Sequence, residues 1–212
     1  MQIVVEALCA GAIATLPSGK ASGIAKRPIE GPVEIRQRGI PVDEQADRRH
    51  HGFPAMALHH YPGEHYAWLR ETFGALPRLA GAGSMGENIA ARGLTEDDVS
   101  IGDRFRLGSA LLEVSQPRQP CATIEQHHRQ TGIVKAIVAT GRCGWFYRVL
   151  EAGICAAGDA LQREERGHED WTIARTFAAV YGRKPDPSAM REIAGLPRVS
   201  DRLQRDIEKR IG

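Results

Sequence analysis

The chain has 212 residues, of which 42% are hydrophobic and 25% are charged, and its formal net charge is +2. These values are typical of an ordinary globular protein, and they exclude a disordered chain, a collagen and a coiled coil. The small net charge does not indicate a nucleic-acid or anionic-membrane partner. Arginine greatly outnumbers lysine, which favours binding of phosphates and carboxylates, although a bias in codon use gives the same excess.

The sequence also carries information about its compartment. No stretch of 18 apolar residues occurs, so no membrane-spanning helix is predicted. Residues 1–20 lack the basic and apolar regions of a secretory signal. The four cysteines, Cys9, Cys121, Cys143 and Cys155, are sparse and do not form metal-type pairs. We therefore expect free thiols in a reducing, cytoplasmic compartment.

Short β-type runs between turn signals dominate the first three quarters of the chain. Apolar residues bounded by glycine, proline and aspartate predict strands over residues 3–8, 33–36, 104–107, 110–114, 145–150 and 160–163. Two helices are predicted among them. One covers residues 61–73 and is entered through Pro62, and a short one covers residues 121–130.

The C-terminal part has a different character. The charged string over residues 162–170 is typical of a linker. After it, apolar residues recur at helical spacing, Pro187 begins a second helical segment, and Ser200 is an N-cap candidate for a third. The sequence therefore predicts a fold that is mainly β with α, with one domain over residues 1–163 and a small three-helix module over residues 168–212.

The most unusual string is S-Q-P-R-Q-P-C at residues 115–121. Its two prolines end the predicted strand, and Cys121 stands where a helix can begin. A thiol at a helix N-terminus beside Arg118 is favoured as a thiolate, which can be a nucleophile, a persulfide carrier or a soft-metal ligand. The alternative is a small buried hydrophobic residue, which is what we expect of the other three cysteines.

Histidines gather in the first half of the chain, where five of the eight lie within residues 50–65. No ligand pair among them has a recognised spacing with a third partner, so a zinc site, a polar loop and the rim of a binding site all stay open. The string M-G-E-N, which ends at Asn88, is a turn or a further part of such a rim.

Residues 141–148 enter a predicted strand through two glycines and carry Arg142 and Arg148. Arginines beside backbone that a ligand can approach closely suit an anion. No G-x-G-x-x-G follows a strand, and no P-loop motif, C-x-x-C cluster or haem motif occurs. The sequence therefore carries no recognisable flavin, nicotinamide or iron–sulfur site.

Several strings form an ordered set. They are D-x-Q-A-D at 43–47, H-H-G at 50–52, H-H-Y-P-x-E-H-Y at 59–66, G-E-N at 86–88, G-L-T-E at 93–96, I-G-D at 101–103, Q-P-R-x-P-C at 116–121, G-R at 141–142 and G-W at 144–145. Over residues 1–210 the chain resembles MOSC-domain proteins of the YiiM type, named for the C-terminal domain of molybdenum cofactor sulfurase, with their three-helix module. It departs from the family pattern at Phe53, Ala122 and Cys143.

The resemblance implies a MOSC β-barrel-like fold that binds a molybdenum cofactor of the molybdopterin type and does not require pyridoxal phosphate. It implies that Cys121 is the catalytic residue and the thiolate ligand of molybdenum. The residues expected to hold the cofactor or form the rim of its site are Arg118, Arg142, Arg148, Asn88, His51 and Lys26.

The implied activity is reduction of N-hydroxylated compounds such as 6-hydroxylaminopurine, in which R–NH–OH becomes R–NH2 and water. Because the chain lacks electron-carrier motifs, we expect a separate donor, a flavoprotein reductase. The alternative is a sulfur carrier or cofactor-handling protein with a persulfide on Cys121. The near-balanced charge of residues 171–211 disfavours nucleic-acid binding. The helical module either docks the electron donor or packs on the barrel through Trp171, Phe177 and Leu203.

Overall fold

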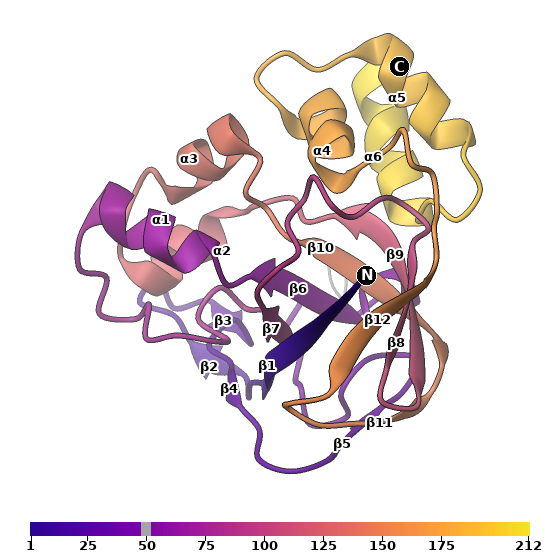
Figure 1. Cartoon of the computed structure of the whole chain (residues 1–212). Coiled ribbons are helices and arrows are strands. Elements are labelled where there is room, and N and C mark those ends of the chain that lie inside the picture. Colours follow the sequence, from indigo (N-terminus) through magenta and orange to yellow (C-terminus); the bar gives the residue numbers. More distant parts are fainter. Residues whose placement is uncertain (48–51) are drawn as a thin grey trace.

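The computed structural model describes residues 1–47 and 52–212. Within this part, seven strands close into a barrel (Figure 1). In order around the barrel they are β12 (Ala160–Glu165), β8 (Arg104–Leu107), β9 (Ala110–Pro117), β10 (Trp145–Glu151), β6 (Leu58–Pro62), β7 (Ile89–Ala91) and β1 (Gln2–Ala10). Strands β6 and β7 run parallel, whereas β1 closes the barrel by pairing antiparallel with β12, so that Ile3 lies opposite Leu161.

Shorter elements surround the barrel. Strand β4 (Arg27–Pro28) pairs with β1, β2 (Ala14–Thr15) pairs with β3 (Ala21–Ser22), and β5 (Val33–Ile35) pairs with β11 (Gly153–Cys155). The 3₁₀ helix η1 (Pro54–Met56) precedes β6. Helices α1 (His65–Phe73), α2 (Ala122–His128) and α3 (Ile133–Thr140) gather on one side of the barrel (Figure 1).

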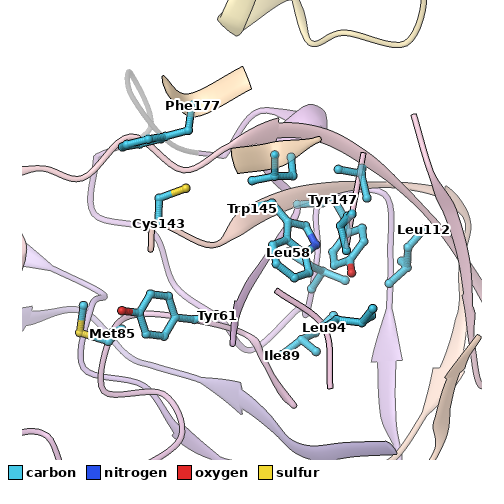
Figure 2. Packing of buried hydrophobic residues seen from close by; sticks show 14 of the residues in the cluster. Leu58, Tyr61, Met85, Ile89, Leu94, Leu112, Cys143, Trp145, Tyr147 and Phe177 are labelled. Atoms are coloured by element: carbon cyan, nitrogen blue, oxygen red, sulfur yellow. The ribbon is translucent and has the colours of Figure 1, made fainter. Parts of the chain in front are cut away.

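The barrel interior is filled by large apolar side chains. Trp145 and Tyr147 of β10 are fully buried beside Leu58 of β6 (Figure 2). Phe105 of β8 meets the Tyr147 ring edge-on, with 6.0 Å between ring centroids. Burial of each such side chain stabilises the fold by about 1.5–3 kcal/mol, so the large apolar residues of these strands contribute much of the stability of the barrel.

Three helices follow the barrel and gather at one end of it (Figure 1). They are α4 (Ile173–Tyr181), α5 (Pro187–Gly195) and α6 (Asp201–Ile211), and Thr172, Asp186 and Ser200 cap them with side-chain oxygens. The three-helix prediction is thus confirmed. Trp171, Phe177 and Leu203 are at most 2% exposed and share one hydrophobic cluster with the barrel (Figure 2 shows Phe177). The module therefore packs on the barrel, whereas docking of a partner stays a prediction.

The predicted fold class is confirmed, but the helix expected over residues 61–73 is wrong at its start. Strand β6 ends at Pro62, and α1 begins at His65. All five residues of β6 are buried, so both faces of the strand are covered and its sequence does not alternate between apolar and polar residues. The division at residues 163 and 168 stays a prediction. No helix in the described part of the chain is long and apolar enough to cross a membrane.

Candidate functional site

The most unusual string of the sequence forms the end of β9 and the turn between β9 and α2. Pro117 ends β9, and the Arg118 backbone N–H donates to the Gly144 carbonyl at 3.0 Å. Cys121 then takes an extended conformation as the N-cap residue of α2. Its thiol is exposed, whereas Cys9, Cys143 and Cys155 are buried. The structure therefore places the one predicted reactive cysteine at the surface, and burial raises the pKa of the other three thiols, that of Cys9 to about 12.

A cavity of about 120 Å³ lies next to Cys121. Its wall combines cationic, carboxylate, amide, imidazole, thiol and aromatic side chains, which include those of Lys26, Glu44, Asp47, His59, Asn88, Arg118, Cys121 and Phe146. Four of the residues predicted from the sequence, namely Cys121, Arg118, Lys26 and Asn88, are thus brought together. They come from the β9–α2 turn, the segment before β4 and the segment before β7.

A buried polar network fixes the floor of this cavity. Lys26 and Asp43 form an ion pair, and their side chains are 10% and 3% exposed. The Asn88 side-chain amide donates to Asp43 at 2.9 Å and to the Cys9 carbonyl at 3.1 Å, and its oxygen accepts from the His59 backbone N–H at 3.1 Å. Burial lowers the pKa of Lys26, and Asp43 opposes that shift. Because Asp43 already pairs with it, Lys26 offers little free charge to a ligand.

Arg118 differs from Lys26 in this respect. It is half-buried in the cavity wall, and within the described residues its guanidinium forms no ion pair or hydrogen bond. Its positive charge helps burial to lower the pKa of His59 well below the ordinary value, so the His59 imidazole is neutral at pH 7. Arg118 therefore gives the cavity a cation that is free to bind an anion.

His59 was not singled out as a site residue from the sequence, and the H-H-Y-P string was its only signal. It is 3% exposed and lies beside Phe146, with 5.2 Å between the ring centroids. Neither ring nitrogen makes a well-formed hydrogen bond with the described residues, although the Gly86 backbone lies near the ring. A buried polar group without a partner is unfavourable, so this imidazole suits a ligand that supplies one.

Two predicted arginines lie elsewhere. The Arg142 guanidinium stacks over Trp68 of α1, 4.9 Å from the ring centroid. Arg148 on β10 pairs with Glu113 of β9 at 3.6 Å and donates to the Arg198 carbonyl at 3.1 Å. Neither residue lines the cavity beside Cys121. His51 lies outside the described residues.

A second, larger cavity of about 380 Å³ shares Arg118, Cys121 and Phe146 with the first, and α6 contributes Arg202 and Asp206 to its wall. Nothing in the sequence linked α6 to Cys121. Within residues 1–47 and 52–212, no group of three or more His, Cys, Asp or Glu side chains is placed to hold a metal ion.

The comparison with protein families decides the classification. The family model of the MOSC domain matches residues 47–162, and that of the YiiM-like, 3-alpha helix domain matches residues 171–211. The chain belongs to the MOSC domain family. Among MOSC proteins it is 36% identical to Protein YiiM of Escherichia coli (strain K12) over 200 residues, which are 94% of this chain and 89% of that protein.

Further relatives extend the comparison. A Gibberella moniliformis protein named Reductase is 33% identical over 177 residues, which are 83% of this MOSC chain but only 31% of the fungal protein. The crystal structure of YiiM from Geobacillus stearothermophilus superposes with a TM-score of 0.81 at 32% identity and 100% coverage of both chains. That of YiiM from Escherichia coli also gives 0.81, at 29% identity, with 100% of this chain and 92% of that one covered.

The residues present fit a molybdenum cofactor of the molybdopterin type. Cys121 offers an exposed soft ligand, Arg118 a free cation for a phosphate, and His59 an imidazole without a well-formed partner for a polar heterocycle. The two cavities share Cys121 in their walls.

Proposed function

We propose that this protein is a molybdenum-cofactor-dependent reductase of N-hydroxylated compounds, for example 6-hydroxylaminopurine. The observation that carries the proposal is the exposed Cys121 thiol at the junction of two cavities, beside the free Arg118 guanidinium. Membership of the MOSC family and the likeness to a fungal protein named Reductase support it.

In this proposal each residue of the site has its own role in binding the cofactor. The Cys121 thiolate holds the metal, because a soft sulfur ligand suits molybdenum bound by a sulfur-rich cofactor. Arg118 binds the phosphate, and Asn88 and Lys26 keep the cavity floor rigid through Asp43. Neutral His59 presents one donor and one acceptor to the cofactor.

When bound, the cofactor supplies the two-electron chemistry that breaks the N–O bond. The balanced reaction is R–NH–OH plus two electrons and two protons, giving R–NH2 and water. The electrons come from a separate reductase, which we propose to be a flavoprotein, since the sequence has no motif for an electron carrier. The purified chain is expected to be inactive with NADPH alone and active with a reduced viologen. Steady turnover with NADPH alone would contradict the need for a partner.

The test is to produce the protein in a host that makes the cofactor, and then to measure molybdenum per chain and reduction of 6-hydroxylaminopurine. We expect about one molybdenum per chain, loss of both metal and activity in Cys121→Ser, and an unchanged circular dichroism spectrum. Cys9→Ser is the matched control, because Cys9 is buried, and its activity should stay within a few-fold of wild type.

Two results would overturn the proposal. One is full reductase activity in Cys121→Ser. The other is cyanide-releasable sulfur on Cys121 in a chain without molybdenum, which would instead support a persulfide carrier.

A further inference from the structure

The wall of the larger cavity includes two parts of the chain that lie more than 80 residues apart. The β9–α2 turn supplies Arg118 and Cys121, and α6 supplies Arg202 and Asp206. Between them lies Phe146, which is 8% exposed. The C-terminal helices thus do more than cover the barrel, since one of them forms a wall of the space that faces the proposed metal ligand.

Helix α6 is fixed against the strand that leads to Cys121. The Ser200 backbone N–H donates to the Ser115 carbonyl at 3.2 Å, and the Ser200 hydroxyl donates to the Gln116 side-chain oxygen. The same hydroxyl accepts from the Leu203 backbone N–H at 2.9 Å and so caps the helix. Because Ser200 is 0% exposed, these bonds hold Arg202 in a defined position relative to Cys121.

Arg202 and Asp206 stand one turn apart on α6, and their side chains are 24% and 14% exposed. The Arg202 Nε–H donates to Asp206 Oδ2 at 3.1 Å, and the Tyr181 hydroxyl donates to the same oxygen at 3.2 Å. With the described residues, the Arg202 Nη groups and Asp206 Oδ1 make no further hydrogen bond. The pair therefore presents adjacent donors and an acceptor on a rigid support.

A flat, nitrogen-rich ring fits such a wall. Apolar and aromatic surface from Met56 and Phe146 can cover the face of the ring, while the guanidinium donates to a ring nitrogen or carbonyl and the carboxylate accepts a ring N–H. A ligand held in this way extends from α6 towards Cys121. Small hydroxylamines, by contrast, have no ring edge with which to reach the pair.

We propose that Arg202 and Asp206 are specificity-determining residues, which bind the polar edge of a heterocyclic substrate in the cavity beside Cys121. This inference rests on the proposed reductase function and names the part of the site that recognises the ring. Loss of either residue is therefore expected to change KM for the heterocyclic substrate. It should leave kcat unchanged, because the pair lies away from the reacting atoms.

The experiment compares Arg202→Met and Asp206→Asn with the controls Arg205→Met and Glu208→Gln, which change exposed residues of the same helix. Loaded protein is assayed with a reduced viologen and either 6-hydroxylaminopurine or hydroxylamine. We expect Arg202→Met and Asp206→Asn to raise KM for the purine about tenfold or more, with molybdenum content, kcat and KM for hydroxylamine within twofold of wild type. The controls should match wild type with both substrates.

Equal changes in KM for the two substrates, or changes no larger than in the controls, would overturn the assignment. Calorimetric titration of the loaded protein with 6-hydroxylaminopurine separates this proposal from the reductase proposal. If wild type binds the purine and Arg202→Met binds it at least tenfold more weakly, the ring subsite stands even when no turnover occurs, and only the reductase proposal fails. If wild type does not bind the purine, or Arg202→Met binds it as tightly as Arg205→Met, the ring subsite is wrong.

Discussion

The hydroxyl of Ser200 donates a hydrogen bond to the side-chain oxygen of Gln116, and both residues are buried. Gln116 is the penultimate residue of β9, five positions before Cys121, and Ser200 caps α6. One contact thus connects the helical module to the strand that positions the reactive thiol. Changes in the module are therefore expected to affect the site as well as the stability of the protein.

Ser200→Ala should lower the free energy of unfolding by roughly 2–4 kcal/mol. The loss of an N-cap contributes about 1 kcal/mol. Leaving the buried Gln116 side chain without its partner contributes about 1–3 kcal/mol more. Thr172→Ala is the matched control, because it removes the N-cap of α4 at a half-buried position. Its free energy of unfolding should fall by the N-cap contribution alone, about 1 kcal/mol. Urea unfolding of the two variants tests this, and equal losses would show that the bond to Gln116 adds nothing.

Arg118→Ala should lower molybdenum occupancy about tenfold or more when cofactor is limiting, because a charge-assisted hydrogen bond contributes about 1.5–3 kcal/mol. Arg142→Ala should leave occupancy unchanged, since Arg142 stacks on Trp68 away from the cavity. Metal analysis of both variants, each titrated with the same amount of cofactor, distinguishes the two arginines. A similar loss in both would place Arg142 at the cofactor after all.

The stability of the protein should fall as the pH falls below about 6.5. Burial, with a smaller effect of His65, lowers the pKa of His60 from 6.5 to about 3. The unfolded chain therefore takes up a proton between these values that the folded chain does not. The contribution of neutral His60 to the free energy of unfolding is fully present above pH 6.5. It is lost progressively towards pH 3, by about 1.4 kcal/mol per pH unit.

His60→Gln removes this titration. Its unfolding free energy should therefore depend less steeply on pH between 6 and 4.5 than that of wild type, by about 1.4 kcal/mol per pH unit. Urea unfolding at a series of pH values measures both slopes. Because the burial of His59 and His128 also lowers their pKa values, some acid sensitivity remains in the variant. Identical slopes would mean that His60 is not buried as a neutral side chain.

Deletion of residues 168–212 should abolish viologen-driven and partner-driven turnover together. The truncated barrel would expose the apolar surface that Trp171, Phe177 and Leu203 now cover, and the wall of the larger cavity would be missing. Size-exclusion chromatography and a viologen assay check the outcome. A monomeric truncated protein that still reduces substrate with viologen, but not with the reductase, would instead assign the module to partner docking.

The sequence was sufficient for apolar strands bounded by turn signals and for sites formed within one short segment. The predicted strands at 104–107 and 110–114 correspond to β8 and β9, and Cys121 stands at the start of α2 as expected. Strand β6 was not predicted, because it is buried on all sides and carries His59 and His60 where an apolar run is expected. Its environment depends on neighbours that are distant in sequence.

The contacts of the arginines also depend on residues that are distant in sequence. Arg148 was grouped with an anion site from its position after two glycines, but its partner is Glu113, which lies directly opposite it on β9. That pairing depends on strand register, which single-sequence patterns do not specify. Arg202 and Asp206 reach the site only because α6 folds back onto β9, so no local motif could have indicated them.

The closure of the barrel by β1 and β12 constrains the order of events during biosynthesis. Residues 2–4 pair with residues 160–162, which the ribosome supplies about 160 residues later. At a synthesis rate of about 5–20 residues per second, roughly 10–30 s pass between the synthesis of β1 and that of β12. Its exposed Val4 and its unpaired edge must stay free of other chains during that interval. We therefore expect the yield of folded protein to depend on chaperones that hold the nascent strand β1, more than on the stability of the finished fold.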